Sequence, residues 1–138
     1  MQNIGLAIKF LFQANFILAM NIKNTTKKPI IAKNAELCRN IFTKSIGLMF
    51  SIKPKPLIFV FKKEKIIPLH MLFVFYPIDV LFLNKNKVVA EIKENFKPFS
   101  FYTPKNKAQY VIEITTVTSK RIKADVGDRI EFKIERFK

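Results

Sequence analysis

The chain has 138 residues, enough for one domain, and 49% of them are hydrophobic, which supports a packed core and excludes a disordered tail. Lysine and arginine outnumber aspartate and glutamate by 25 to 10, so the formal net charge is +15. Such an excess is typical of proteins that bind nucleic acid or another anionic surface. A genome rich in A/T codons, which favours Lys, Ile, Asn and Phe, also produces it, so both explanations stay open.

Several kinds of catalytic and metal site are excluded by residue counts. Cys38 is the only cysteine and His70 the only histidine, so neither an internal disulfide nor a Cys/His zinc site is available. Gly5, Gly47 and Gly127 are the only glycines, which excludes the glycine-rich phosphate loops and the G-x-S-x-G elbow. We predict no cofactor and no metal, and the sequence leans away from an enzyme.

Residues 1–20 are predicted to be an extension, either helical or translated from a misassigned start, with Met20 as a second possible start. Their apolar stretch begins at Leu6, is interrupted at Lys9, and is shorter than the roughly 20 apolar residues of a membrane-spanning helix. It also lacks the features of a signal peptide. We therefore expect no transmembrane segment, a cytoplasmic location, and one β-rich domain over residues 21–138.

One helix is predicted early in this domain, over about residues 35–45. Asn34 is a good N-cap residue, apolar residues recur at three- and four-residue spacing from Leu37 to Phe42, and Gly47 suits the position after a helix. Cys38 would lie on the apolar face of this helix, so we interpret it as a buried small hydrophobic residue rather than a nucleophile.

The remainder of the chain is dominated by strand patterns. Three apolar runs bounded by turn signals, Leu57–Phe61, Met71–Phe75 and Ile78–Leu83, predict neighbouring strands that are buried on both faces. Hairpin-turn residues follow at 84–87, and then a further strand is predicted over Val88–Ile92.

The C-terminal third alternates more regularly. Tyr110–Thr115 is predicted as a strand with one polar face, 117–122 as a short helical turn, 125–128 as a tight turn, and Arg129–Glu135 as the last strand. Strands at this spacing, joined mostly by short loops, indicate a small antiparallel β-sandwich or a partly open barrel.

Four segments resemble a known family. They are Gly47-Leu48-Met49-Phe50, the Pro77-Ile78-Asp79-Val80-Leu81-Phe82 step, the strand Tyr110–Ile114, and Val126–Phe132. Together they make the chain similar, over roughly residues 21–136, to the prokaryotic domain-of-unknown-function family 192, the uncharacterised ACR family. The resemblance implies a compact antiparallel β-sandwich with little helix, and it brings no biochemical activity with it.

The chain departs from the family pattern at two places. Many members read E-R-x-x-G-L-M before the first strand, where this chain has Thr43-Lys44-Ser45-Ile46-Gly47. Many also read M-K-N-T ahead of the Pro-Leu-Asp step, where this chain has Met71-Leu72-Phe73-Val74. If the polar Lys-Asn-Thr segment performs chemistry in those members, this protein lacks it.

Asp79 is the most informative polar residue, because a carboxylate within a buried strand must be hydrogen-bonded or paired. Either it accepts backbone N–H groups at a bulge near Pro77, or it contacts a ligand together with His70 and Tyr76. His70 is the one side chain that titrates near neutrality without perturbation. Asp79 with His70 is also the pair that an enzyme or a metal-dependent factor would use.

The hypothesis that we favour is a non-enzymatic β-sandwich module that binds a polar or anionic ligand. The ligand would lie near Asp79, His70 and Tyr76, or on a lysine-rich face that could also hold nucleic acid. A third possibility is that the apolar extension docks on a partner or a membrane. The lysines of that face are Lys53, Lys55, Lys62, Lys63 and Lys65.

Overall fold

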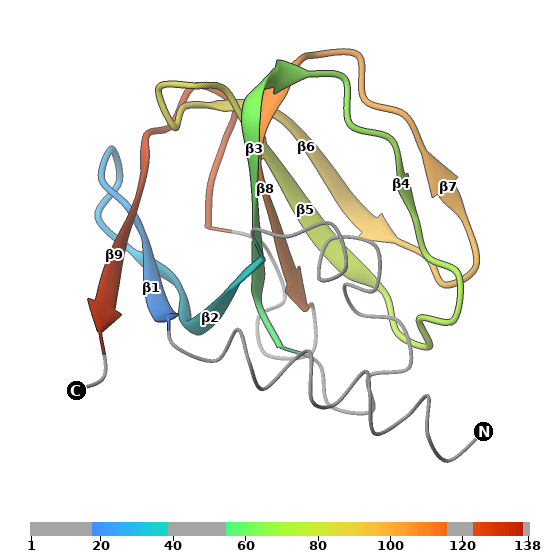
Figure 1. Cartoon of the computed structure of the whole chain (residues 1–138), viewed down its shortest axis with the longest axis horizontal. Coiled ribbons are helices and arrows are strands. Elements are labelled where there is room, and N and C mark those ends of the chain that lie inside the picture. The colour runs from blue at the N-terminus through green and yellow to red at the C-terminus, as the bar shows by residue number, and fades with distance from the viewer. Residues whose placement is uncertain (1–17, 39–54, 116–122, 137–138) are drawn as a thin grey trace.

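The computed structural model describes residues 18–38, 55–115 and 123–136 (Figure 1). Within those ranges the chain forms strands and turns and no helix. The described residues therefore contain no helix that could span a membrane. The strands are β1 (Leu18–Asn24), β2 (Ile30–Cys38), β3 (Leu57–Lys65), β4 (Leu69–His70), β5 (Ile78–Leu83), β6 (Val89–Phe96), β7 (Phe101–Tyr102), β8 (Ala108–Thr115) and β9 (Ile130–Arg136).

Seven strands form one curled sheet in the order β6-β5-β8-β3-β2-β1-β9, while β4 and β7 form a separate two-stranded sheet. Neighbouring strands are antiparallel except for β2 and β3, which are parallel. Val88 bridges Arg129, and the N–H of Ile130 donates to the carbonyl of Lys87 at 2.9 Å, so the two edges of the sheet meet at one end. The result is a half-barrel.

The predicted fold class is therefore confirmed in part. The chain is mainly β, and the half-barrel corresponds to the partly open barrel. A purely antiparallel sandwich is wrong, because seven of the nine strands form one curled sheet in which β2 and β3 are parallel. The expected extension lies mostly outside the described residues, and its last three residues, 18–20, are the start of β1.

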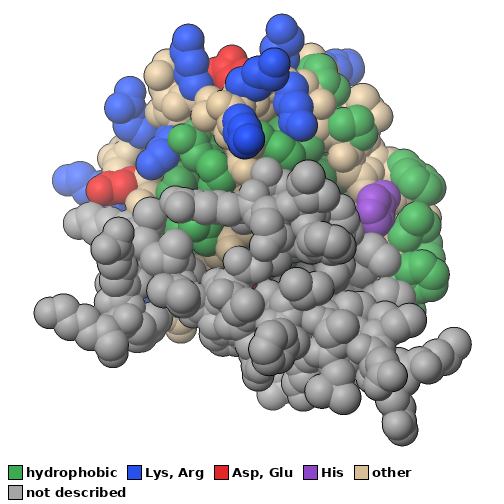
Figure 2. Space-filling model, in the orientation of Figure 1, with side chains coloured by type: hydrophobic (Ala, Val, Ile, Leu, Met, Phe, Trp, Pro, Cys, Tyr) green, Lys and Arg blue, Asp and Glu red, His purple; other side chains and the backbone are tan. Residues whose placement is uncertain are grey.

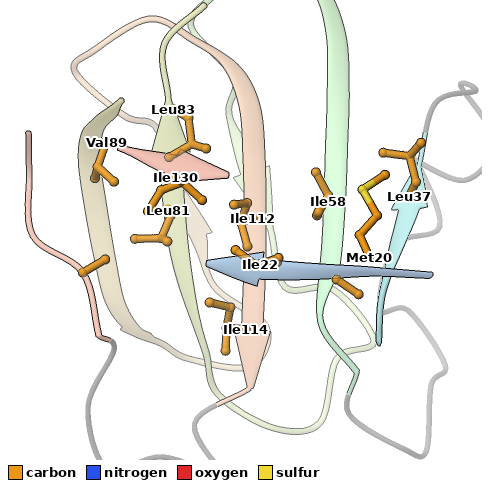
Figure 3. Packing of buried hydrophobic residues seen from close by; sticks show 12 residues of the cluster. Met20, Ile22, Leu37, Ile58, Leu81, Leu83, Val89, Ile112, Ile114 and Ile130 are labelled. Atoms are coloured by element: carbon orange, nitrogen blue, oxygen red, sulfur yellow. The ribbon is translucent and has the colours of Figure 1, made fainter. Parts of the chain in front are cut away.

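The interior of the half-barrel is an apolar cluster that receives every second side chain of its strands, because alternate residues of a strand point to opposite faces. Figure 3 shows these side chains converging from β1, β2, β3, β5 and β8. We call this set the inner cluster: Met20, Ile22, Ala35, Leu37, Ile58, Leu81, Leu83, Val89, Ile112, Ile114, Ala124 and Ile130.

The other face of the same sheet is also covered. The segment 66–77 and the β4–β7 sheet pack against it, so all six residues of β5 are buried, as predicted for Ile78–Leu83. We call this second set the outer cluster: Cys38, Leu57, Phe59, Ile67, Met71, Val74, Ile78, Val80, Phe82, Phe96, Ala108 and Val111. Each fully buried Ile, Leu or Phe contributes on the order of 2 kcal/mol to folding.

The predicted helix at 35–45 is wrong where it is described, because residues 35–38 belong to β2. Leu37 enters the inner cluster and Cys38 the outer one, so these consecutive apolar residues are buried on opposite faces of a strand. Asn34 adopts φ 55° within β2 rather than capping a helix. Cys38 is buried, as expected. The remainder of this helix and the predicted turn at 117–122 lie outside the described residues.

The run Met71–Phe75 is not the strand that we expected. β4 ends at His70, a turn follows at Leu72 and Phe73, and Phe73 has φ 56°. The run is divided between the interior and the surface: Met71 and Val74 are buried, but Phe73 and Phe75 are exposed. Leu57–Phe61 has the same pattern of five apolar residues and does form part of β3, so tertiary packing separates the two outcomes.

Candidate functional site

Lysine side chains gather at the end of the half-barrel where its two edges meet. Figure 2 shows Lys and Arg side chains over the upper end of the molecule, where Figure 1 places the end of β3, the β5–β6 turn and the β7–β8 loop. Within these three segments Glu64 is the one carboxylate of the sequence. We call the lysines of these segments the basic end: Lys62, Lys63, Lys65, Lys85, Lys87, Lys105 and Lys107.

The three segments of the basic end are fixed to one another by the backbone. Glu64 Oε1 accepts a hydrogen bond from the N–H of Lys85 at 2.7 Å, which joins β3 to the β5–β6 turn. Lys65 pairs with Ala108 at the start of β8, which joins β3 to the β7–β8 loop. Asn84 shapes the β5–β6 turn, because its Oδ1 accepts the N–H of Val88 at 3.1 Å. The lysines are therefore carried on a rigid frame.

Glu91 organises the loop that carries Lys105. Its carboxylate accepts the Tyr102 hydroxyl at 2.6 Å, the N–H of Lys105 at 2.9 Å, and two donors of Asn106. Burial acts to raise the pKa of Glu91, but these hydrogen bonds lower it below its ordinary value. The same hydrogen bond to Glu91 raises the pKa of Tyr102 to about 12. The oxygens of Glu91 are thus occupied by the loop.

Six of the seven lysines are exposed, and Lys87 differs from them. Its ammonium lies 4.3 Å from the centroid of the Phe132 ring and 5.7 Å from that of Tyr110, a cation–π arrangement, and the residue is half-buried. Lys87 is therefore part of the frame, and the other six lysines present their ammonium groups to solvent.

The predicted lysine-rich face is divided by the structure. Lys62, Lys63 and Lys65 belong to the basic end, whereas Lys55 precedes β3 and pairs with Glu36 at 2.8 Å. At about 3.3 Å per residue, Lys55 is roughly 25 Å along the strand from Lys63. Lys53 lies outside the described residues.

Asp79 is positioned by an irregularity of β6 rather than by Pro77. Ile78 pairs with Phe96 and Val80 with Lys93, so two residues of β6 lie opposite Asp79. The N–H of Asn95, which has φ 48°, donates to Asp79 Oδ1 at 2.8 Å. Burial raises the pKa of Asp79 above its ordinary value, the Asn95 N–H opposes this, and the charge of Glu94 adds to the rise. Asp79 therefore holds a β-bulge.

His70 and Tyr76 lie on the other side of the sheet from Asp79. Asp79 shares its face with Leu81 of the inner cluster, whereas Tyr76 packs against the outer cluster. His70 is exposed on β4, and its Nδ1 accepts the N–H of Leu72 at 3.2 Å. In the described part of the chain no hydrogen bond or ion pair joins Asp79 to His70. A joint role of these residues in ligand binding or catalysis stays a prediction.

The sequence profile of the DUF192 family, described as uncharacterised ACR, matches residues 20–132. The chain belongs to this family.

The family's relatives share both sequence and fold with the chain. A UPF0127 protein of Pyrococcus furiosus is 37% identical over 111 residues, which cover 79% of this chain and 95% of that protein. A crystal structure of a protein of unknown function from Novosphingobium aromaticivorans has a TM-score of 0.70 at 22% identity, covering 83% of this chain and 84% of that one. A Sinorhizobium meliloti structure, described as a proposed transcription regulator, has a TM-score of 0.71 at 23% identity, covering 83% and 92%.

The DUF192 motif around Pro77 now has a structural explanation. Pro77 precedes β5, and Asp79 then fixes the bulge of β6. In the upstream motif, Phe73 stands where many members have Asn, and it has φ 56°. Asn adopts this left-handed conformation at a lower energetic cost than Phe, so Asn would strain the backbone less at this position than Phe73 does.

Glu113 is a candidate that the sequence analysis missed. It lies in β8 between Leu57 of β3 and Val80 of β5, and it shares their face, which the outer cluster covers. Burial alone raises its pKa to about 8, and no described residue donates a hydrogen bond or forms an ion pair to its carboxyl. The alternating pattern of β8 suggested a polar face. The signal that it is buried lay in β3 and β5, whose apolar runs exclude water from both faces.

Asn24 and Asp128 form a second buried polar network that we did not predict. Asn24 Nδ2 donates to Asp128 Oδ2 at 2.7 Å, and Asp128 Oδ2 also accepts the N–H of Asp125 at 2.8 Å. Asn24 Oδ1 accepts the N–H of Thr26 at 3.0 Å. The network ties the β1–β2 turn to the turn at 125–128, so its role is structural. Among the described residues, no group of three His, Cys, Asp or Glu side chains is placed to hold a metal ion.

Proposed function

We propose that this protein is a non-enzymatic binding module that holds a polyanion on its basic end. The observation that carries the proposal is the convergence of six exposed lysines from three separate segments onto one end of the half-barrel. The Glu64 carboxylate holds the β5–β6 turn to β3, and strand pairing holds the β7–β8 loop to β3, so the charges are held together without the polyanion.

The chemistry of the basic end favours a ligand recognised by charge rather than by sequence. The lysine ammonium acts as a point charge, whereas the planar guanidinium group of arginine usually forms the bidentate hydrogen bonds that recognise bases and phosphates. Within the three segments all basic residues are lysines. A single-stranded nucleic acid supplies closely spaced phosphates of this kind, and a cytoplasmic location would give access to it.

The test is a salt titration with a fluorescently labelled oligothymidylate of about 20 nucleotides, long enough to cover several lysines. If about five phosphates are contacted, log K should fall with log salt with a slope of about −3.5. Absence of binding at low salt, or a slope near zero, would contradict the proposal.

A triple variant localises the binding. Lys63→Gln, Lys85→Gln and Lys105→Gln together should reduce the slope by about 2 and weaken binding at least tenfold at moderate salt. The matched control is Lys23→Gln, Lys33→Gln and Lys97→Gln, which removes the same charge from exposed lysines elsewhere. Equal loss in both variants would show that only the net charge matters, and the basic end would then not be the site.

A further inference from the structure

Four phenylalanine side chains are exposed in two segments that lie next to each other. The exposed fractions are 45% for Phe73, 63% for Phe75, 52% for Phe99 and 72% for Phe101. They account for most of the large exposed hydrophobic side chains of the described residues; the others, Ile30, Ile66 and Val126, are scattered. A contiguous apolar patch on a small protein is a sign of an interaction site. We call these four residues the aromatic knob.

The knob is one structural unit. The Phe99 ring lies edge-on to Phe73, with centroids 6.2 Å apart, and to Phe75, with centroids 5.6 Å apart. The backbones are joined beneath the rings, because Met71 donates to the carbonyl of Ser100 and accepts the N–H of Phe99, both at 2.8 Å. Phe101 follows on β7, paired with His70. Figure 2 shows hydrophobic side chains gathered beside the histidine at the right-hand edge.

The backbone beneath the knob is strained. Phe73 and Phe99 both have φ 56°, a conformation that is unfavourable for a bulky aromatic residue. Such strain persists where the surrounding structure enforces it, and it is concentrated at functional sites. Here the buried side chains of Met71 and Val74 anchor the loop. Phe73 and Phe99 therefore combine a strained backbone conformation with an aromatic side chain exposed to solvent.

The two segments that carry the knob, residues 69–77 and 96–104, contain no acidic residue, and Lys97 is their one permanently charged residue. The Glu91 carboxylate beside them is occupied by hydrogen bonds from Tyr102 and the loop 105–106. A second copy of the chain is a poor occupant, because each copy carries a net charge of +15. Bases of a nucleic acid are also disfavoured, since these rings pack against each other and stand apart from the basic end. A surface with negative charge outside and an apolar layer beneath it would attract the positive charge of the protein and would also receive the exposed rings.

We propose that the aromatic knob docks on the interface of a lipid bilayer that contains anionic headgroups. The rings enter the boundary between headgroups and acyl chains, and Lys97 together with the net positive charge attracts the protein to the surface. This inference is independent of the polyanion proposal, because the two surfaces share no residue.

The test uses the full chain and vesicles of about three parts phosphatidylcholine to one part phosphatidylserine, compared with pure phosphatidylcholine. The protein should sediment with the mixed vesicles and much less with the neutral ones. The Phe75→Ser/Phe101→Ser variant should bind at least about tenfold more weakly. The matched control, Ile30→Ser/Val126→Ser, removes exposed apolar side chains elsewhere and should bind as the unaltered protein does.

A fluorescence measurement keeps the proposal testable if the serine variant does not fold. Phe101→Trp introduces the only tryptophan of the chain, at the most exposed phenylalanine of the described residues, and its emission should shift to the blue when mixed vesicles are added. An unchanged emission would overturn the proposal. So would vesicle binding that is undiminished in the folded serine variant, or a dimer that forms without lipid and is lost in that variant, since the occupant would then be a second copy.

Discussion

Asp79 and Glu113 are buried carboxylates on the neighbouring strands β5 and β8, and they differ in the hydrogen bonds that the sheet provides. Asp79 faces the inner cluster near the sheet edge, where β6 bulges to bring the N–H of Asn95 to its oxygen. Glu113 faces the outer cluster in the middle of the sheet, where its backbone pairs with Leu57 of β3 on one side and Val80 of β5 on the other. The edge strand β6 can bulge to bring an N–H to a carboxylate, whereas none of the described residues donates a hydrogen bond to Glu113, and burial raises its pKa to about 8.

The largest expected effect concerns the proton of Glu113. Its pKa is about 8 in the folded protein and about 4.5 when unfolded, so the unfolded state ionises first as the pH rises. Stability is therefore lost between these two pH values and is not recovered above them. Glu113→Gln should remove this loss and make the protein more stable than the unaltered one by on the order of 3 kcal/mol at pH 9.

Urea unfolding of both proteins at pH 4 and pH 9 measures this difference, because at pH 4 the carboxyl is largely neutral in both states and Glu and Gln are then close to equivalent. An equal difference in stability at the two pH values would show that Glu113 is ionised in the folded protein. The contrast with Asp79 would then disappear.

The second effect concerns the bulge. Asp79→Ala leaves the N–H of Asn95 buried without an acceptor, and we expect a cost of about 1–2 kcal/mol in the free energy of unfolding. Asp79→Asn keeps an oxygen in place and should cost less. It should also remove the loss of stability that accompanies ionisation of Asp79, whose raised pKa makes folding less favourable as the pH rises above its ordinary value. Equal costs for the two variants would show that the hydrogen bond is unimportant.

The smallest effect concerns the backbone at Asn95. Its φ of 48° is tolerated by Asn and is free of steric cost for Gly, so Asn95→Gly should change stability by no more than about 0.5 kcal/mol. Asn95→Val, at the same position, should be clearly destabilising because a β-branched residue disfavours this conformation. Thermal unfolding compares the two; similar melting temperatures would argue that the bulge relaxes readily.

The sequence predicted those parts of the fold in which local pattern and tertiary environment agree. The strand at Ile78–Leu83, the strand Tyr110–Thr115 and the turns at 84–87 and 125–128 are confirmed. The helix expected from residue 35 is wrong where the structure describes it, because a strand with both faces buried can have the same apolar spacing as a helix. Met71–Phe75 forms a loop, because the pairing of β4 with β7 ends at His70 and the chain turns at Leu72 and Phe73.

The candidate site was less predictable than the fold. The sequence shows the cluster formed by Lys62, Lys63 and Lys65. Lys85 and Lys105 lie near it only because the β5–β6 turn and the β7–β8 loop lie at the same end of the half-barrel. The strand expected at Tyr110–Thr115 is confirmed, but its expected polar face is wrong, because Val111–Thr115 are all buried and Glu113 lies under the outer cluster. Such placements depend on strand order, which single-sequence patterns do not encode.

The pairing of β1 with β9 places residues 18–24 beside residues 130–136, so this contact spans most of the chain. During synthesis β1 leaves the ribosome long before its partner exists, and until then one of its edges has unsatisfied N–H and C=O groups. A sheet whose order is completed by its last strand folds slowly for its size, since closing so long a loop precedes the gain from the contact. The exposed edge of β1 must therefore be kept from pairing with other nascent chains on the same messenger RNA until β9 has been synthesised.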